Sequence, residues 1–121
     1  MRQLVTAIVL AASGALACAS VPEPRSEISA ADLALRRAEQ ADAGHGAPLE
    51  LRTARDQYEA AQKAVSDGEY LQARRLAENA TVEAQLAEAK AREARAKSVA
   101  SDAEQNLDAL QGEANRPLEN R

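Results

Sequence analysis

The sequence predicts an all-α fold: a short helix followed by an antiparallel helical hairpin whose C-terminal helix is long, coiled-coil-like and partly unpaired. Thirty of the 121 residues are alanine, which has the highest helix propensity, and Glu, Gln, Arg, Lys and Leu make up much of the rest. Phe and Trp are absent and Tyr58 and Tyr70 are the two aromatic residues, so small side chains must form the core. The few glycines and prolines divide the alanine-rich region into three helical stretches.

The first helix is expected to begin near Ala30. Ser29-Ala30-Ala31-Asp32 has the form of a capping box, and Ile28 and Leu33 are placed to form the hydrophobic staple beside it. Gly44-His45-Gly46 is expected to end this helix. Its narrow apolar stripe, with spacings of three and four residues, is predicted to comprise Ile28, Ala31, Leu35 and Ala38.

The second helix is expected from Pro48 to about Ser66, because proline suits the first position of a helix. Gly68 offers a left-handed C-cap, and helical sequence resumes directly after it. The second and third helices must therefore turn back on each other as an antiparallel hairpin. The buried stripe of the second helix is predicted to comprise Leu51, Ala54, Tyr58, Ala61 and Val65.

The third helix is expected to run from Glu69 to Gln111, because no glycine or proline interrupts this stretch of about 43 residues, or roughly 65 Å. Its first half carries small residues at alternating spacings of four and three, which allow close helix packing: Ala73, Ala77, Ala80, Ala84, Ala87, Ala91 and Ala94. The two shorter helices cannot cover its second half. There the apolar stripe shifts to a predicted partner surface of Ala96, Ala100, Ala103, Leu107 and Leu110.

The beginning of the chain has the layout of a cleaved export signal: Arg2, an apolar stretch from Leu4, and small residues up to Ala17, just before Cys18. The apolar stretch ends at Ala19 and has about 16 residues, fewer than the about 20 of a transmembrane helix. We therefore expect cleavage between Ala17 and Cys18. The predicted organisation is a signal peptide over 1–17, a lipidated cysteine and flexible tether over 18–28, an alanine-rich helical domain over 29–111, and a disordered tail over 112–121.

Ala15-Leu16-Ala17-Cys18 resembles a bacterial lipobox, in which a cysteine after a small residue becomes the acylated N-terminus. Members of that class usually have Leu, Val or Ile where this chain has Ala15. The resemblance implies a lipid anchor at Cys18, and Ala19 in place of aspartate implies the periplasmic face of the outer membrane. Two alternatives stay open: an ordinary signal peptidase cut at the same bond would leave a free thiol, and a cut after Ala19 would remove Cys18.

The run from residue 47 to about residue 100 resembles the alanine-rich bacterial family catalogued as domain of unknown function 4398. The resemblance is carried by Ala47-Pro48-Leu49-Glu50-Leu51, by Gly68-Glu69-Tyr70 and by the alanines between and after them. It implies a small periplasmic lipoprotein with no assigned activity; some members also carry a peptidoglycan-binding domain, which is not expected here after Leu110. The Gly-x-Tyr turn leading into Ala-x-x-x-Ala is also similar to a single tetratricopeptide-type hairpin.

The residue pattern favours a function based on contact over catalysis. Carboxylates are spread over helix surfaces, and His45 lies between two glycines with no partners at metal-ligand spacing. Tyr58 and Tyr70 are expected to fill gaps left by alanine. The formal net charge is −4, or −5 once Arg2 leaves with the signal, and charges of both signs are interspersed along the helices. This pattern argues against nucleic-acid binding, which usually needs a basic face. No enzyme activity, cofactor, metal or small-molecule substrate is predicted.

The leading hypothesis is a lipid-anchored, non-catalytic interaction module of the cell envelope, whose stripe near Leu107 and Leu110 contacts an envelope protein or a second copy. The alternative is a structural alanine zipper that resembles murein lipoprotein, in which the third helix forms a parallel trimer and spaces the outer membrane from the cell wall. Murein lipoproteins look like one uninterrupted helix ending in a lysine joined to peptidoglycan. This chain has helix breakers and ends in Arg121, so covalent wall attachment is not expected.

Overall fold

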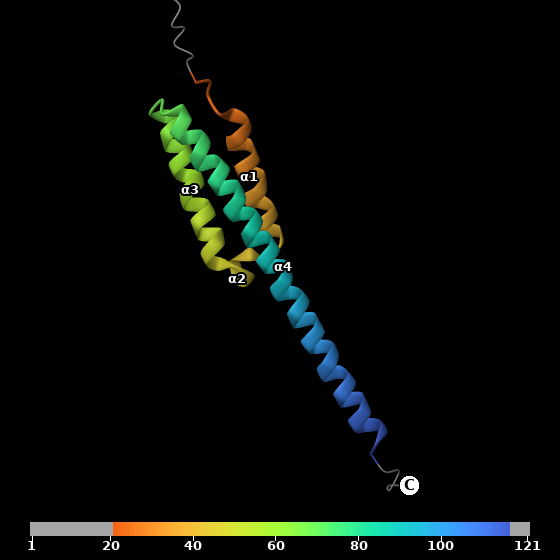
Figure 1. Cartoon of the computed structure of the whole chain (residues 1–121). Helices are drawn as coiled ribbons and strands as arrows, with labels where there is room; N and C mark the ends of the chain where they lie inside the picture. Colours follow the sequence, from red (N-terminus) through yellow and green to blue (C-terminus); the bar gives the residue numbers. More distant parts are fainter. Residues whose placement is uncertain (1–20, 117–121) are drawn as a thin grey trace, which may run out of the picture.

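The computed structural model describes residues 21–116, and within this range the chain is almost entirely helical and has no strand (Figure 1). The all-α prediction is therefore confirmed. Outside the described residues lie the predicted signal peptide with Ala17, the predicted lipidation site Cys18, the next two residues of the expected tether, and residues 117–121. The helices are α1 (Arg25–Gln40), α2 (Ala43–Gly46), α3 (Pro48–Ser66) and α4 (Tyr70–Ala114).

The three long helices pack side by side, with α1 and α4 running in the same direction and α3 antiparallel to both (Figure 1). α4 packs against each of the other helices, so it forms the centre of the bundle. It also continues well past the end where the single turn of α2 joins α1 to α3. The predicted hairpin is present, and α1 completes it as a three-helix bundle.

α1 begins at Arg25, earlier than the predicted start near Ala30. Pro24 is the N-cap, it is buried, and its carbonyl accepts a hydrogen bond of 3.1 Å from the Ile28 amide. The capping-box interpretation was wrong, because Ser29 lies inside the helix and Leu33 is 50% exposed instead of forming a staple. The apolar side chain of Ile28 packs on the bundle core, which favours extending the helix backwards. The last residues of the expected tether, 25–28, are thus helical.

α1 also ends earlier than expected, at Gln40, and the glycine-containing segment forms the separate helix α2. Asp42, between the two helices, has a φ of 63°, a left-handed conformation that a short polar side chain tolerates. Gly46 lies against α4: a Cβ atom there would be 2.7 Å from Cα of Ala91. The glycine is therefore required for the close approach of α2 to α4, besides its expected role in interrupting the helix.

α3 spans the predicted residues, and its C-terminus closes with the predicted left-handed glycine. Gly68 has a φ of 77°, its amide donates to the Val65 carbonyl at 3.0 Å, and the Glu69 amide donates to the Ala64 carbonyl at 2.8 Å. These two bonds form a Schellman motif, which satisfies carbonyls at the helix end. α4 then begins at Tyr70 and turns back along α3.

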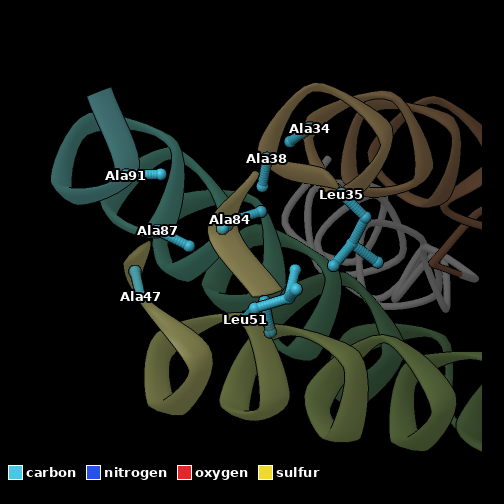
Figure 2. Close-up of a cluster of buried hydrophobic side chains, with 10 residues drawn as sticks. Ala34, Leu35, Ala38, Ala47, Leu51, Ala84, Ala87 and Ala91 are labelled. Atoms are coloured by element: carbon cyan, nitrogen blue, oxygen red, sulfur yellow. The ribbon is translucent and has the colours of Figure 1, made fainter. Parts of the chain in front are cut away.

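The core consists of alanines with two leucines, Leu35 and Leu51 (Figure 2). The buried residues form two hydrophobic clusters. Tyr58 is partly buried and packs against both of them, as expected for a side chain that fills gaps between alanines. Val65 is partly buried, and the fully packed residue of that turn is Ala64, which the predicted stripe did not include. Small side chains allow the helix axes to approach closely but bury little apolar area per residue.

Ion pairs between helices surround this core at the surface. Arg55 of α3 donates to Glu39 of α1 at 2.6 Å, and Lys90 of α4 donates to Glu50 of α3. The second bond raises the pKa of Lys90 and lowers the pKa of Glu50. Exposed pairs of this kind contribute little to the free energy of unfolding, so the alanine core holds the bundle together and the ion pairs help to fix its alignment.

Candidate interaction surface

The part of α4 beyond the bundle is the candidate site. Every residue from Arg92 to Arg116 is exposed, and we call residues 92–116 the projecting segment. Its helical part, to Ala114, is about 35 Å long at 1.5 Å per residue. Figure 1 shows it leaving the bundle as a single helix with no neighbour among the described residues. The predicted length mismatch between the helices is therefore confirmed.

The core-facing side of α4 ends at Ala91, directly before the projecting segment. The small residues from Ala73 to Ala91 that were predicted to form a seam are buried, and we call them the core seam. Ala94, predicted as its last member, is exposed, because α1 and α2 end before reaching it. α4 also runs on to Ala114, which places residues 112–114 of the expected tail in the helix.

All five residues of the predicted partner stripe lie exposed along one face of the projecting segment. Leu107 is 58% exposed and Leu110 is 67% exposed, so two leucines one turn apart on the helix are open to water. The alternating spacing of four and three residues places the whole set on one side. The structure thus brings together, and leaves uncovered, Ala96, Ala100, Ala103, Leu107 and Leu110.

The sequence alone did not predict that this exposed stripe continues along α4 toward its N-terminus, into the part of the helix that packs in the bundle. Val82 is 62% exposed and Leu86 is 42% exposed, and both lie on the side of α4 that faces away from the core. Each follows a core-seam residue by two positions, which corresponds to about 200° around the helix. The same spacing of four and three in the sequence was the available signal. We call the complete set the outer stripe: Val82, Leu86, Ala89, Glu93, Ala96, Ala100, Ala103, Leu107, Leu110 and Ala114.

The projecting segment changes sign of charge along its length. Residues 92–97 carry a net positive charge, and the charged residues over 102–113 are all acidic. Glu93, the one charged member of the outer stripe, forms an ion pair of 2.7 Å with Lys97. The bond to Lys97 lowers the pKa of Glu93, which favours the ionised carboxylate. The basic residues near the bundle are Arg92, Arg95 and Lys97, and the acidic ones further along are Asp102, Glu104, Asp108 and Glu113. Arg116, at the end of the segment, forms an ion pair of 3.1 Å with Glu113.

The other residues singled out from the sequence do not form a second site. His45 is exposed in α2, and its Nδ1 lies 2.6 Å from a carboxylate oxygen of Asp42, which raises the pKa of His45. No cluster of metal-ligating side chains occurs among residues 21–116. Tyr70 is partly buried at the start of α4, while Tyr58 contributes to the core. Within the described range, no helix combines the length and the apolar character that crossing a membrane requires.

The fold and this surface define a class of protein: an alanine-packed three-helix bundle that presents one long, uncovered helix. The family model described as Domain of unknown function (DUF4398) matches residues 26–103, more than half of the chain, and the chain belongs to this family. The match includes α1, which the sequence resemblance left out, and ends within the outer stripe. No curated protein and no solved structure matches the chain significantly.

Proposed function

We propose that this protein is a lipid-anchored, non-catalytic interaction module of the cell envelope, which contacts another protein chain through the outer stripe. The observation that carries the proposal is the complete exposure of residues 92–116, including two leucines at helical spacing. Contiguous apolar surface that stays open to water marks interaction sites in soluble domains. Spreading this surface along a single helix suits recognition of another helix.

The anchor in this proposal is Cys18, at the end of the export-signal pattern, on the periplasmic face of the outer membrane. α1 starts at Arg25, so few residues separate Cys18 from the bundle. The far end of α4 lies at the opposite end of the described structure from the start of α1 (Figure 1). A bundle held at its Cys18 end would therefore present the projecting segment away from the membrane surface, toward other envelope components.

The structural alternative, a parallel alanine zipper that spaces membrane and cell wall, receives less support from the packing. A zipper needs an alanine seam that is free to face its own copies. The seam from Ala73 to Ala91 is already buried against α1 and α3. The tetratricopeptide-like turn at Gly68 likewise serves packing within the chain, because it closes the hairpin of α3 and α4.

The anchor is tested by the intact mass of the membrane-extracted protein, wild type beside Cys18→Ser. We expect a tri-acyl mass increment on Cys18 that is absent from the variant, because the thiol is the acylation site. An unmodified mature mass in both proteins would contradict the lipid anchor.

The contact surface is tested by photo-cross-linking in cells that produce the full chain. A photoreactive residue replaces Leu107 in the outer stripe, and a matched control replaces Gln105, which is exposed about 200° around the same helix. We expect a cross-linked protein product from position 107 and much less from position 105. Absence of any product at position 107, in a chain that is normally produced and folded, would contradict the interaction.

A further inference from the structure

We infer that the outer stripe from Ala89 to Ala114 is covered by the same residues of a second copy that runs antiparallel to it. The inference rests on the proposed function and names the partner of that surface. Two properties of α4 carry it: the spacing of the outer stripe, which is that of a coiled-coil seam, and the reversal of charge along the projecting segment.

The outer stripe alternates spacings of four and three residues from Val82 to Ala114, the pattern of the two core positions of a heptad repeat. In an antiparallel pair, one core position of each helix faces the other core position of its partner. The register centred on Ala100 facing Ala103 of the second copy also places Leu107 opposite Ala96. A large side chain then meets a small one at Leu107, and the small residues at the centre of the register allow the two helices to approach closely.

The charges beside the stripe match in this register. Lys97 and Glu104 both lie on the same flank of the seam, and in the antiparallel pair Lys97 of each copy faces Glu104 of the other. On the other flank, Arg92 of each copy faces Glu113 of the other. All four of these pairs are attractive, and they are repeated by the two-fold symmetry of the dimer.

Neighbouring registers and the parallel orientation lose this match. A shift by one heptad in one direction places Glu104 opposite Glu104. The opposite shift places Lys97 opposite Lys97, with Glu104 opposite Lys90, which is already bonded to Glu50 of its own chain. A parallel, in-register pair would place Arg92 of each copy beside Lys97 of the other, which is repulsive. The charge pattern therefore selects one orientation and one register, as flanking charges do in coiled coils.

The bundle leaves room for this arrangement. The outer stripe lies about 200° around α4 from the core seam, so the second copy approaches from the side away from α1 and α3. The tip of its α4, at Ala114, then reaches Ala89, which is exposed on the bundle. Glu93 faces Leu110 of the second copy at the margin of the paired region; a charged residue at a core position weakens a seam but helps to fix its register.

The test uses the full chain extracted from membranes in detergent, so that every variant carries the same anchor, and sedimentation measures its association. Lys97→Glu and Glu104→Lys each turn two attractive pairs into repulsive ones, and we expect each to weaken the dimer about tenfold. An equimolar mixture of the two variants restores opposite charges across the interface, and we expect it to regain the wild-type affinity. The control Asp102→Lys has the same charge change as Glu104→Lys on the outward side of α4, and we expect it to leave the dimer unchanged.

Three results would overturn the inference: a wild-type chain that stays monomeric, charge variants that behave like Asp102→Lys, or a tighter dimer for Lys97→Glu, which is the sign expected for a parallel pair. The photo-cross-link at position 107 separates the two proposals. A product that contains a different protein would overturn the second copy as partner and leave the interaction module in place, whereas no product would contradict the interaction module itself.

Discussion

Replacing Gly46 by alanine tests how closely the alanine bundle is packed. A Cβ atom at Gly46 would lie 2.7 Å from Cα of Ala91, 3.1 Å from its Cβ and 3.5 Å from its carbonyl carbon. Carbon atoms in favourable contact are about 3.5–4.0 Å apart, so α2 would have to move away from α4 by close to 1 Å. The nearest atoms belong to the backbone of α4, which cannot rotate aside as a side chain would.

The magnitude follows from two opposing effects. Inserting a methyl group into a packed contact costs about 1–3 kcal/mol. Replacing glycine in a compatible conformation stabilises by about 0.4–1 kcal/mol, because the unfolded chain loses freedom. At Gly44 in the same helix, a Cβ atom would have no neighbour within 4 Å, so Gly44→Ala experiences the second effect alone. The two variants should therefore differ by about 1–3 kcal/mol, with Gly46→Ala less stable than the wild type and Gly44→Ala at least as stable.

Thermal unfolding of the full chain, followed by circular dichroism, measures the difference. For a domain of this size, about 1 kcal/mol corresponds to roughly 4–8 °C in Tm. We expect Gly46→Ala to melt several degrees below Gly44→Ala. Equal melting temperatures for the two variants would refute the close contact between α2 and α4.

If the core seam is closely packed, Ala77→Leu should overpack the bundle and lower the free energy of unfolding, measured by chemical denaturation, by about 1–3 kcal/mol. The control Ala109→Leu, on the exposed part of α4, should have little effect, and similar losses in the two variants would contradict the buried seam. Gly68→Ala should cost about 1–2 kcal/mol, because an L-residue is strained at a φ of 77°; an unchanged midpoint would refute this. Asp42→Asn keeps a residue that tolerates a positive φ, and it should return the raised pKa of His45 toward 6.5 in an NMR titration. Because the folded-state pKa of His45 is raised, its small stabilisation is present below pH 6.5 and is lost as the pH rises through the raised pKa; a titration midpoint unchanged in Asp42→Asn would contradict this pair.

The sequence predicted α3 and its turn well because the signals there are local. Pro48 fixes the first position of the helix, and Gly68 supplies the left-handed residue that its end requires. Neither depends on what the helix packs against. The start of α1 could not be found in the same way, because the local capping-box pattern at Ser29 favours one start and the folded chain has another, directly after Pro24. The burial of Pro24 and the packing of Ile28 decided between them, and both are tertiary effects.

The candidate surface was predictable in part for a comparable reason. The length of α4 follows from the absence of glycine and proline, and its excess over the shorter helices predicted that residues near Leu107 would lie uncovered. The sequence of α4 contains two overlapping patterns of the same spacing, two residues apart, and both are rich in alanine. Which pattern faces the core is decided by α1 and α3, so the exposure of Val82 and Leu86 became visible only once the bundle was assembled.

These two patterns divide α4 by the size of their side chains. The core seam is made of alanines alone, which allows three helices to pack closely around α4. The outer stripe includes Leu107 and Leu110, whose larger side chains can bury more apolar area in a contact between only two helices. Starting a helix is costly and extending it is not, so a bundle that holds the first half of α4 also favours the helical form of the projecting half. The bundle thereby supplies a preformed helix in a fixed orientation, and this lowers the entropic cost of binding that a flexible segment with the same residues would incur.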